Sequence, residues 1–396
     1  FTLGKDLGIV MAKGVVIGVI ACVTILPSMI LVCDKLIEKT KHKVIMPDLG
    51  RIAGWITKHY VVFAIAFVVI LVPALYGYTH TDVYYDLTNT LPETFNSKVG
   101  NDKLTEQFNM GATHMILADS NLSAKDSMNM IDEIKKVDGV KLAVSLDSIT
   151  GPSVPQEMIP DEVKDELKSG KYQLMLVASE YASATDEVNA QCDEINKIIK
   201  KYDDSAMLIG EAPCTKDLIE ITDVDFRNVS IISIGAIFII IAFVFKSISL
   251  PIILVSVIEF AIFINMGIPA YTGTVTPFIA SIVIGTIQLG ATVDYAILMT
   301  NKYKRNRSRG MEKKEAITDA LEKSIQSILV SALSFFAATF GVGIYSDIDM
   351  IGSLCMLMAR GAIISMIVVA FILPSMLMIF DRIICATSAG FRIKNK

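Results

Sequence analysis

The chain has 396 residues, of which 53% are hydrophobic and 19% are charged. This composition is too apolar for an ordinary soluble domain and indicates a membrane protein. The net charge of −5 conceals an asymmetry, because residues 79–226 hold 28 acidic and 13 basic residues, a net of −15, and the rest of the chain therefore carries +10. We expect an acidic block outside the membrane and a basic membrane-embedded block.

Seven stretches are apolar and long enough to cross a bilayer, which takes about 20 residues. We expect helices there, because lipid offers no partners to backbone polar groups and a helix satisfies them internally. The sequence thus predicts an α-helical polytopic membrane protein. The seven stretches are residues 14–33, 59–78, 229–245, 251–270, 277–300, 324–345 and 361–380.

Basic residues distinguish the two ends of these helices. The connections 34–52 and 301–314 and the C-terminal tail are rich in lysine and arginine, whereas the short connections 271–276 and 346–350 contain neither. The positive-inside rule places the basic connections in the cytoplasm and residues 79–226 outside. We interpret the basic runs as determinants of topology rather than as a nucleic-acid-binding surface.

Residues 79–226 alternate between strand and helix patterns. A Pro-rich interruption at 151–160, followed by a short helix, separates two β-α-β units, which favours a ferredoxin-like α+β sandwich. His80 and His114 have no evident cysteine or serine partner, so the sequence does not predict an enzyme. The predicted strands are 112–118, 140–146, 172–179 and 206–212, and the predicted helices are 123–137 and 185–202.

The six cysteines show no spacing typical of a metal site or of a disulfide framework. Cys192 and Cys214 both lie in the polar block, so a bridge between them stays open beside the preferred interpretation as separate thiols. We expect no metal and no cofactor.

The two ends of the chain resemble each other. Residues 11–36 align without gaps to residues 358–383, with 11 identities in 26 positions, among them the segment ILPSM and the pair Asp34 and Asp381. The offset of 347 residues predicts tandem units. Residues 37–383 then form one complete unit, and the full protein should contain about 12 membrane helices in two parallel halves.

The repeat and the apolar stretches together predict the domain organisation. The expected segments are the last helix of a missing first half (1–36), a cytoplasmic connection (37–58), a membrane helix (59–78), an extracytoplasmic β-α-β domain (79–226), a five-helix membrane bundle (227–383) and a cytoplasmic tail (384–396).

This organisation resembles the resistance-nodulation-division (RND) transporter superfamily. Gly290, Asp294 and Tyr295 in the segment GATVDY narrow the resemblance to the MMPL (mycobacterial membrane protein large) family, on the fourth helix of a half. The resemblance implies that Asp294 and Tyr295 carry a proton pathway. It also implies that residues 79–226 form a porter domain for lipid-like, hydrophobic or amphiphilic substrates.

The residues themselves support a role for Asp294. A charge in the middle of a membrane helix costs a few kcal/mol and marks function by default. Tyr295 points about 100° away on the same helix, so we expect a tyrosine of the missing half to complete the pair. Gly290 lies one turn from Asp294 and allows another helix to approach closely.

Four further residues are secondary candidates. Gln288 shares the face of Tyr295 and either forms a structural hydrogen bond between helices or supports the relay. Ser331 and Ser334 belong to a stripe of small residues that we interpret as a packing face, with a hydrated proton path as the alternative. Glu259 is a second intramembrane acid and needs a partner.

Lys13 and Arg360 are expected to extend toward lipid head groups at the outer side.

We expect a secondary active transporter of the cell membrane that exports amphiphiles in exchange for protons. No phosphate-binding G-x-x-x-x-G-K-[ST] motif is present, so ATP is not the expected energy source within this chain. The expected partners are membrane lipids, the substrate and the first half, with a homo-oligomer left open and no nucleic acid. The alternatives are a non-transporting lipid sensor of the same fold and an accessory subunit of protein export.

Overall fold

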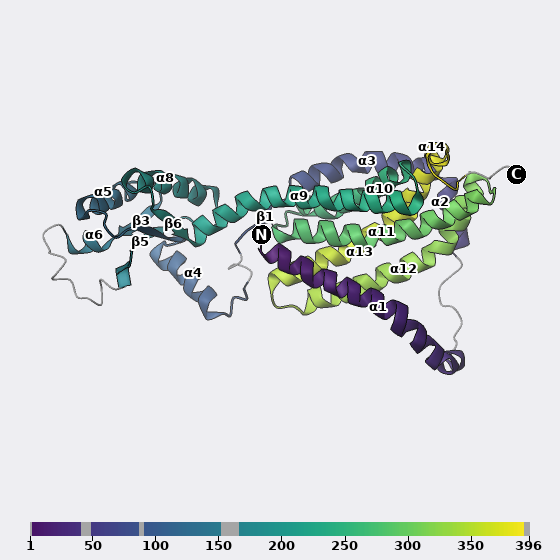
Figure 1. Cartoon of the computed structure of the whole chain (residues 1–396), viewed down its shortest axis with the longest axis horizontal. Coiled ribbons are helices and arrows are strands. Elements are labelled where there is room, and N and C mark those ends of the chain that lie inside the picture. The colour runs from purple at the N-terminus through teal and green to yellow at the C-terminus, as the bar shows by residue number, and fades with distance from the viewer. Residues whose placement is uncertain (1, 41–48, 87–90, 152–165, 392–396) are drawn as a thin grey trace.

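The computed structural model describes residues 2–40, 49–86, 91–151 and 166–391. The molecule is elongated, with a bundle of long helices at one end and an α/β domain at the other (Figure 1). Seven helices in the described part of the chain are long and apolar enough to cross a membrane. They are α1 (Thr2–Lys39), α3 (Tyr60–Thr79), α9 (Glu211–Phe245), α10 (Ser249–Thr272), α11 (Ile279–Ser308), α12 (Lys313–Tyr345) and α13 (Asp349–Ile379).

Most of these helices continue past the apolar stretch that predicts them. The clearest case is α11, which runs to Ser308, so that the loop expected at 301–314 is wrong and only residues 309–312 separate α11 from α12. Hydropathy detects the part of a helix that lipid surrounds, whereas a polar helical extension keeps its backbone hydrogen bonds outside the membrane.

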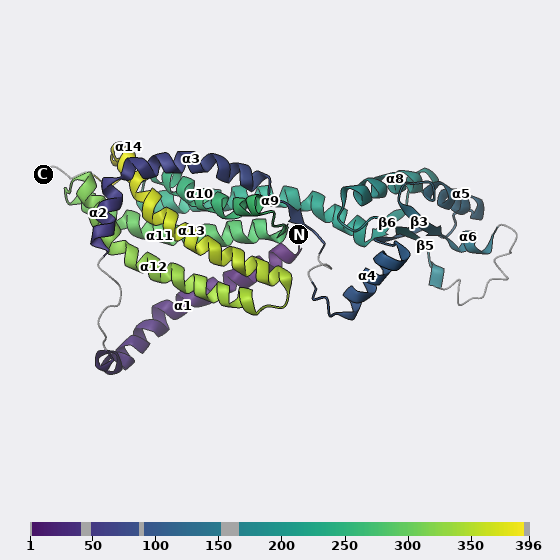
Figure 2. The ribbon, with the colours of Figure 1, turned by 180° about the vertical axis from the view of Figure 1, so that it is seen from behind.

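The core of the bundle lies around α10 and α13. In these two helices 67% and 61% of the apolar segment is buried, whereas the corresponding share in α1 is 0%. Seen from both sides, α1 diverges from the other helices toward its C-terminal end (Figures 1 and 2). Helix α1 is therefore an apolar helix that the described chain leaves largely unpacked, and only its N-terminal part, at Gly8 and Met11, lines a cavity together with α9 and α11.

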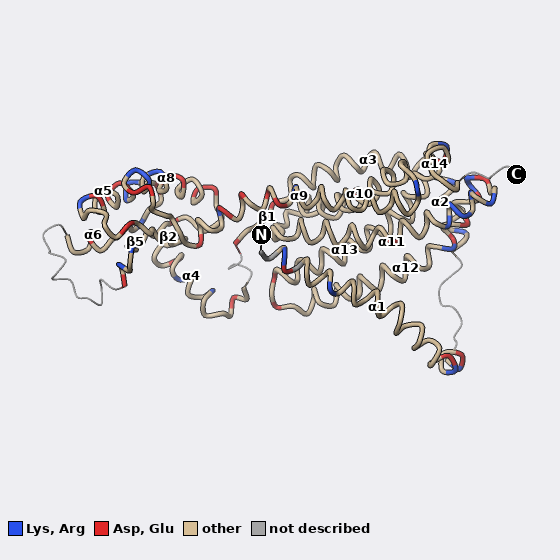
Figure 3. Tube along the Cα trace, viewed as in Figure 1, with Lys and Arg blue, Asp and Glu red and all other residues tan. Residues whose placement is uncertain are grey.

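The two ends of the bundle differ in charge. Lysine and arginine gather at the end that carries the short helices α2 (Gly50–Lys58) and α14 (Asp381–Thr387), which we call the basic end (Figure 3). The opposite end, from which the α/β domain projects, is the domain end. There β1 (Val83–Tyr84) pairs in parallel with β7 (Thr276–Pro277) and ties the segment after α3 to the α10–α11 connection.

The α/β domain is built on an antiparallel sheet with the strand order β3-β5-β2-β6, and β4 pairs with β5 beside it. Each β-α-β unit is split, because a strand of one unit lies between the two strands of the other. The predicted strands agree with the observed ones to within two residues at each end. The elements are α4 (Asn96–Phe108), β2 (Thr113–Asp119), α5 (Ala124–Ile134), β3 (Val140–Val144), α6 (Leu146–Thr150), β4 (Lys168–Ser169), β5 (Tyr172–Ser179), α8 (Asp186–Tyr202) and β6 (Met207–Gly210).

The domain has its own hydrophobic core. Ile116 and Val177 on the sheet pack with Ile131, Ile195 and other apolar side chains of α5 and α8, and all four are fully buried. The short helix expected after the Pro-rich segment lies only partly within the described residues, of which 166 and 167 are helical.

Cys192 and Cys214 are free thiols, so the bridge that the sequence left open is not formed. Cys192 is only 3% exposed. Its burial raises the pKa of the thiol to about 11. Cys214, at the start of α9, is exposed.

Helix α9 joins the domain to the bundle without a break. It begins directly after β6, where Gly210 adopts a positive φ of 129° and a Cβ would lie 2.8 Å from the Thr113 carbonyl oxygen. The boundary expected between residues 226 and 227 lies inside this 35-residue helix. A movement of α9 in the membrane would therefore reach the sheet through continuous helix.

Candidate functional site

Asp294 and Gly290 lie one turn apart on an exposed face of α11. A Cβ at Gly290 would meet no atom within 4 Å. The structure gives the Asp294 carboxylate no hydrogen bond or ion pair to any described residue. The close approach expected at Gly290 is thus not made by another described helix of this chain, and we call this surface the open face of α11.

Tyr295 points away from the open face of α11, into the bundle. Its side chain is only 6% exposed, and its hydroxyl interacts with Ser331 of α12. The separation of Asp294 and Tyr295 follows from the angle of about 100° between neighbours on a helix. Ser331 and Ser334 are exposed on α12, so apart from the Tyr295 hydroxyl at Ser331 the described chain does not cover the predicted packing face at these two positions.

A buried polar network crosses the bundle beside this face. The Asn265 side-chain amide of α10 donates to Gln288 Oε1 over 2.8 Å. Gln288 Nε2 donates to the Ser365 hydroxyl of α13 over 3.0 Å, and the Thr292 hydroxyl also donates to Ser365 over 2.8 Å. Gln288 therefore forms the interhelical hydrogen bonds that were one of the two interpretations of its position.

Arg360 belongs to this network, which corrects the expectation that it extends to the head groups. Its Nε donates to Asn265 Oδ1 over 2.9 Å, and its Nη2 donates to the Asn265 carbonyl over 2.6 Å. The expectation failed because α13 begins at Asp349, well before the predicted apolar stretch at 361, so that Arg360 lies inside the helix. The side-chain and backbone oxygens of Asn265 accept hydrogen bonds from the Arg360 guanidinium and so lower the cost of placing this charge inside the bundle.

Gly361 makes room for the network. A Cβ at this position would lie 2.6 Å from Asn265 Nδ2 and 2.7 Å from Gln288 Oε1. The sequence did not single out Gly361 or Thr292. The internal repeat contained a signal for the former, since Gly14 and Gly361 are identical in the two copies and Lys13 matches Arg360 in charge.

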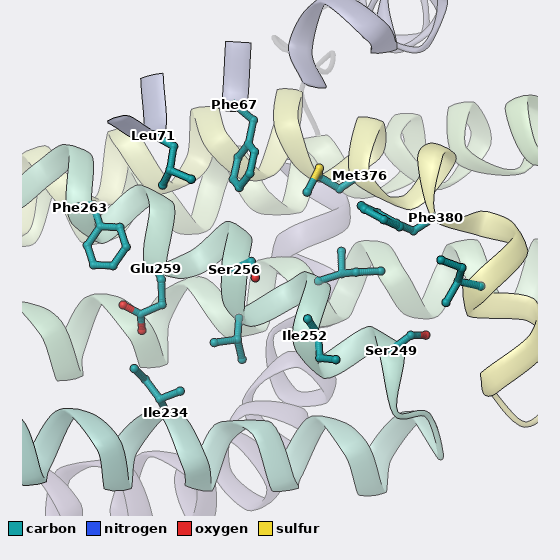
Figure 4. Close-up of a pocket in the computed structure, with 13 residues that line it drawn as sticks. Phe67, Leu71, Ile234, Ser249, Ile252, Ser256, Glu259, Phe263, Met376 and Phe380 are labelled. Atoms are coloured by element: carbon teal, nitrogen blue, oxygen red, sulfur yellow. The ribbon is translucent and has the colours of Figure 1, made fainter. Parts of the chain in front are cut away.

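Glu259 lies in a different part of the bundle, on α10. It lines a cavity of about 570 Å³ between α3, α9, α10 and α13, and its carboxylate points toward the space between Phe263 and Ile234 (Figure 4). No hydrogen bond or ion pair joins this carboxylate to the described residues. No basic residue of the described bundle therefore pairs with this membrane acid, although Tyr78 lies close enough to interact with its charge.

A second cluster holds the basic end together. Arg307 of α11 forms a two-pronged ion pair with Asp381 of α14, at 3.0 and 2.9 Å, and the buried Tyr303 hydroxyl donates to the same carboxylate. Asp381 is the repeat counterpart of Asp34. The basic residues of α11 thus include a structural anchor, besides the role in membrane orientation that the sequence predicts for them.

Known proteins are similar to this chain in both the α/β domain and the helix bundle. A Bacillus subtilis protein, "Putative membrane protein YdgH", is 25% identical over 224 residues, which are 54% of this chain and 23% of that relative. The matched stretch thus spans less than a quarter of the relative's length. The model of the MMPL family matches residues 96–390, from the α/β domain to the end of the bundle. The chain is a multi-pass membrane protein that belongs to the MMPL family.

Proposed function

We propose that the chain acts as one half of an exporter of the cell membrane, which moves lipid-like, hydrophobic or amphiphilic molecules outward in exchange for protons. The observation that carries the proposal is Asp294, an unpaired acid on the open face near the middle of the 30-residue helix α11. An ionisable residue at this depth is costly and marks an ion pathway by default. No cofactor is required.

The internal repeat supports a second half that covers the open face. Helix α13 is anchored by Arg360, by the space at Gly361 and by Asp381 after its end. The counterparts in the unburied helix α1 are Lys13, Gly14 and Asp34. We infer that α1 fits a preceding bundle through the same three anchors. A tyrosine of that bundle would then complete the proton site at Asp294.

Proton binding at Asp294 would favour one of two arrangements of the helices, because a ligand shifts only an equilibrium between states that it binds differently. Helix α9 would carry the movement into the α/β domain. The split β-α-β units and the antiparallel strand order support a ferredoxin-like porter domain, which would pass the substrate outward.

The proposed orientation predicts different reactivities for two cysteines. A membrane-impermeant maleimide added to intact cells should label the exposed Cys214 and leave Cys192 unlabelled until the protein is unfolded. Burial shields Cys192, and its raised pKa leaves little of the reactive thiolate. The measurement is the mass of each labelled peptide.

A control cysteine at the basic end makes this result interpretable. Arg309 is exposed in the α11–α12 connection, so Arg309→Cys should be labelled only after the cells are lysed. Labelling of Arg309→Cys in intact cells, with Cys214 labelled only after lysis, would reverse the proposed orientation.

Export itself is tested in vesicles that contain the full protein and a fluorescent amphiphile. We expect export under an imposed pH gradient and no export after a protonophore has collapsed it. Absence of gradient-dependent flux at normal protein abundance would favour the lipid sensor. Co-purification with a protein-translocation channel, again without flux, would favour the accessory subunit.

A further inference from the structure

We propose that the Glu259 cavity binds an amphiphilic amine, with the ammonium group at Glu259 and the apolar body along α10. The site is distinct from the open face of α11. Its volume of about 570 Å³ lies in the range of small-molecule sites, about 300–1,000 Å³. The proposal combines the shape of the cavity with the one charged side chain that lines it.

The cavity is elongated and follows α10. Ser249 lines it near the basic end, and Glu259 and Phe263 line it near the middle of the helix (Figure 4). Ten residues of helix separate Ser249 from Glu259, which corresponds to about 15 Å. This length suits an alkyl chain or a row of rings rather than a compact polar solute.

The lining determines the body of the ligand. Apart from Glu259 and two serines, every lining residue is apolar. Phe67 lies between the two ends of the cavity, and Phe380 and Met376 lie near the basic end (Figure 4). Binding of an apolar ligand to such walls is favoured by about 25 cal/mol for each Å² of apolar surface that leaves water.

Glu259 determines the charge of the ligand. A carboxylate at this depth is stabilised by an opposite charge or by hydrogen-bond donors. In the described chain Glu259 has no ion pair or hydrogen bond, although the hydroxyls of Tyr78, Ser233 and Thr286 line the smaller cavity beside it. An ammonium group provides both. The neighbouring Phe263 ring adds a partner that also favours cations, whereas a phosphate or carboxylate head group would be repelled.

A smaller cavity on the other side of Glu259 accommodates the remaining donors of the amine. It has a volume of about 140 Å³, shares Glu259, Phe263 and Ile234 with the larger cavity, and is lined by the hydroxyls of Ser233 and Thr286, among others. An ammonium group has three N–H donors, of which Glu259 takes only part. The hydroxyls, directly or through water, can accept the others.

The test measures binding of two matched probes to the full protein in phosphatidylcholine nanodiscs at neutral pH, with empty nanodiscs subtracted. One probe is a dansyl-labelled dodecyl chain with a terminal amine, and the other ends in a hydroxyl. We expect the parent to bind the amine about tenfold more tightly than the alcohol. Glu259→Gln should lose this preference and keep its affinity for the alcohol.

Two further variants keep the proposal falsifiable. Asp294→Asn, which lies two turns of α11 from Thr286 and lines neither cavity, should keep the preference for the amine. Ser256→Trp fills the cavity next to Glu259 and should weaken the binding of both probes. Equal affinity of the parent for the two probes overturns the proposal, as does a Glu259→Gln variant that still prefers the amine, or a Ser256→Trp variant that binds both probes like the parent.

A role of the cavity in transport would depend on the proposed export function. Binding of the amine to the cavity does not depend on it. The nanodisc measurement contains no pH gradient and no transport step. Failure to bind the amine would leave gradient-driven export standing, and failure to export would leave the binding site standing.

Discussion

Replacement of Asp294 by asparagine should leave the protein in the membrane at the abundance of the parent and reduce gradient-driven export to less than about a tenth of the parent rate. Asparagine keeps the shape and the hydrogen-bonding capacity of the side chain but cannot titrate near neutral pH. Stability should not suffer, because Asp294 is on an exposed face and a neutral amide costs less to place in an apolar environment than a carboxylate.

The conservative variant separates the charge from the position. Asp294→Glu keeps a carboxyl group but displaces it by one methylene, so we expect partial export with an altered pH profile. The measurement is flux of the fluorescent amphiphile from energised vesicles, normalised to protein amount. An asparagine variant that exports at the parent rate would show that Asp294 is only structural, and Glu259 would then be the next proton site to test.

Gly361→Ala should destabilise the purified protein by about 3 kcal/mol, seen as a Tm lower by several degrees. The added Cβ would lie 2.6 Å from Asn265 Nδ2 and 2.7 Å from Gln288 Oε1. Either α13 moves away from α10 and α11, or the hydrogen bond between the two amides is lost. Arg360 would lose its position on Asn265 in both cases.

The matched control for this variant is Gly235→Ala in α9. A Cβ at Gly235 meets no atom within 4 Å, so this variant should keep the parent Tm or raise it, because alanine favours the helix over glycine. Equal effects of the two substitutions would mean that the network contributes little to the packing of α13.

The membrane helices and the domain sheet could be predicted because their signals are local. A run of about 20 apolar residues identifies a membrane helix. Strand and helix patterns of apolar residues identify β5 and α8, respectively, to within one residue. The ends of α9 and α11 could not be predicted in this way. Their extensions beyond the membrane are polar helices, which local hydropathy does not distinguish from loops.

The site could be predicted only in part, because its geometry depends on which faces of helices meet. The sequence identified Asp294, Tyr295 and Gln288 as polar positions on one helix, and the spacing explained why the first two point apart. It did not reveal that Gln288 meets Asn265 and Ser365, since these contacts join residues 23 and 77 positions apart. Arg360 was misjudged for the same reason.

The central claim is that substrate export and proton entry are one coupled process. The most direct test uses proteoliposomes with equal pH on both sides, a pH-sensitive dye inside and a gradient of an amphiphile that carries no titratable group. We predict that downhill movement of the amphiphile changes the internal pH through the parent protein and not through Asp294→Asn. Movement of the amphiphile through the parent without any change in internal pH would contradict the account.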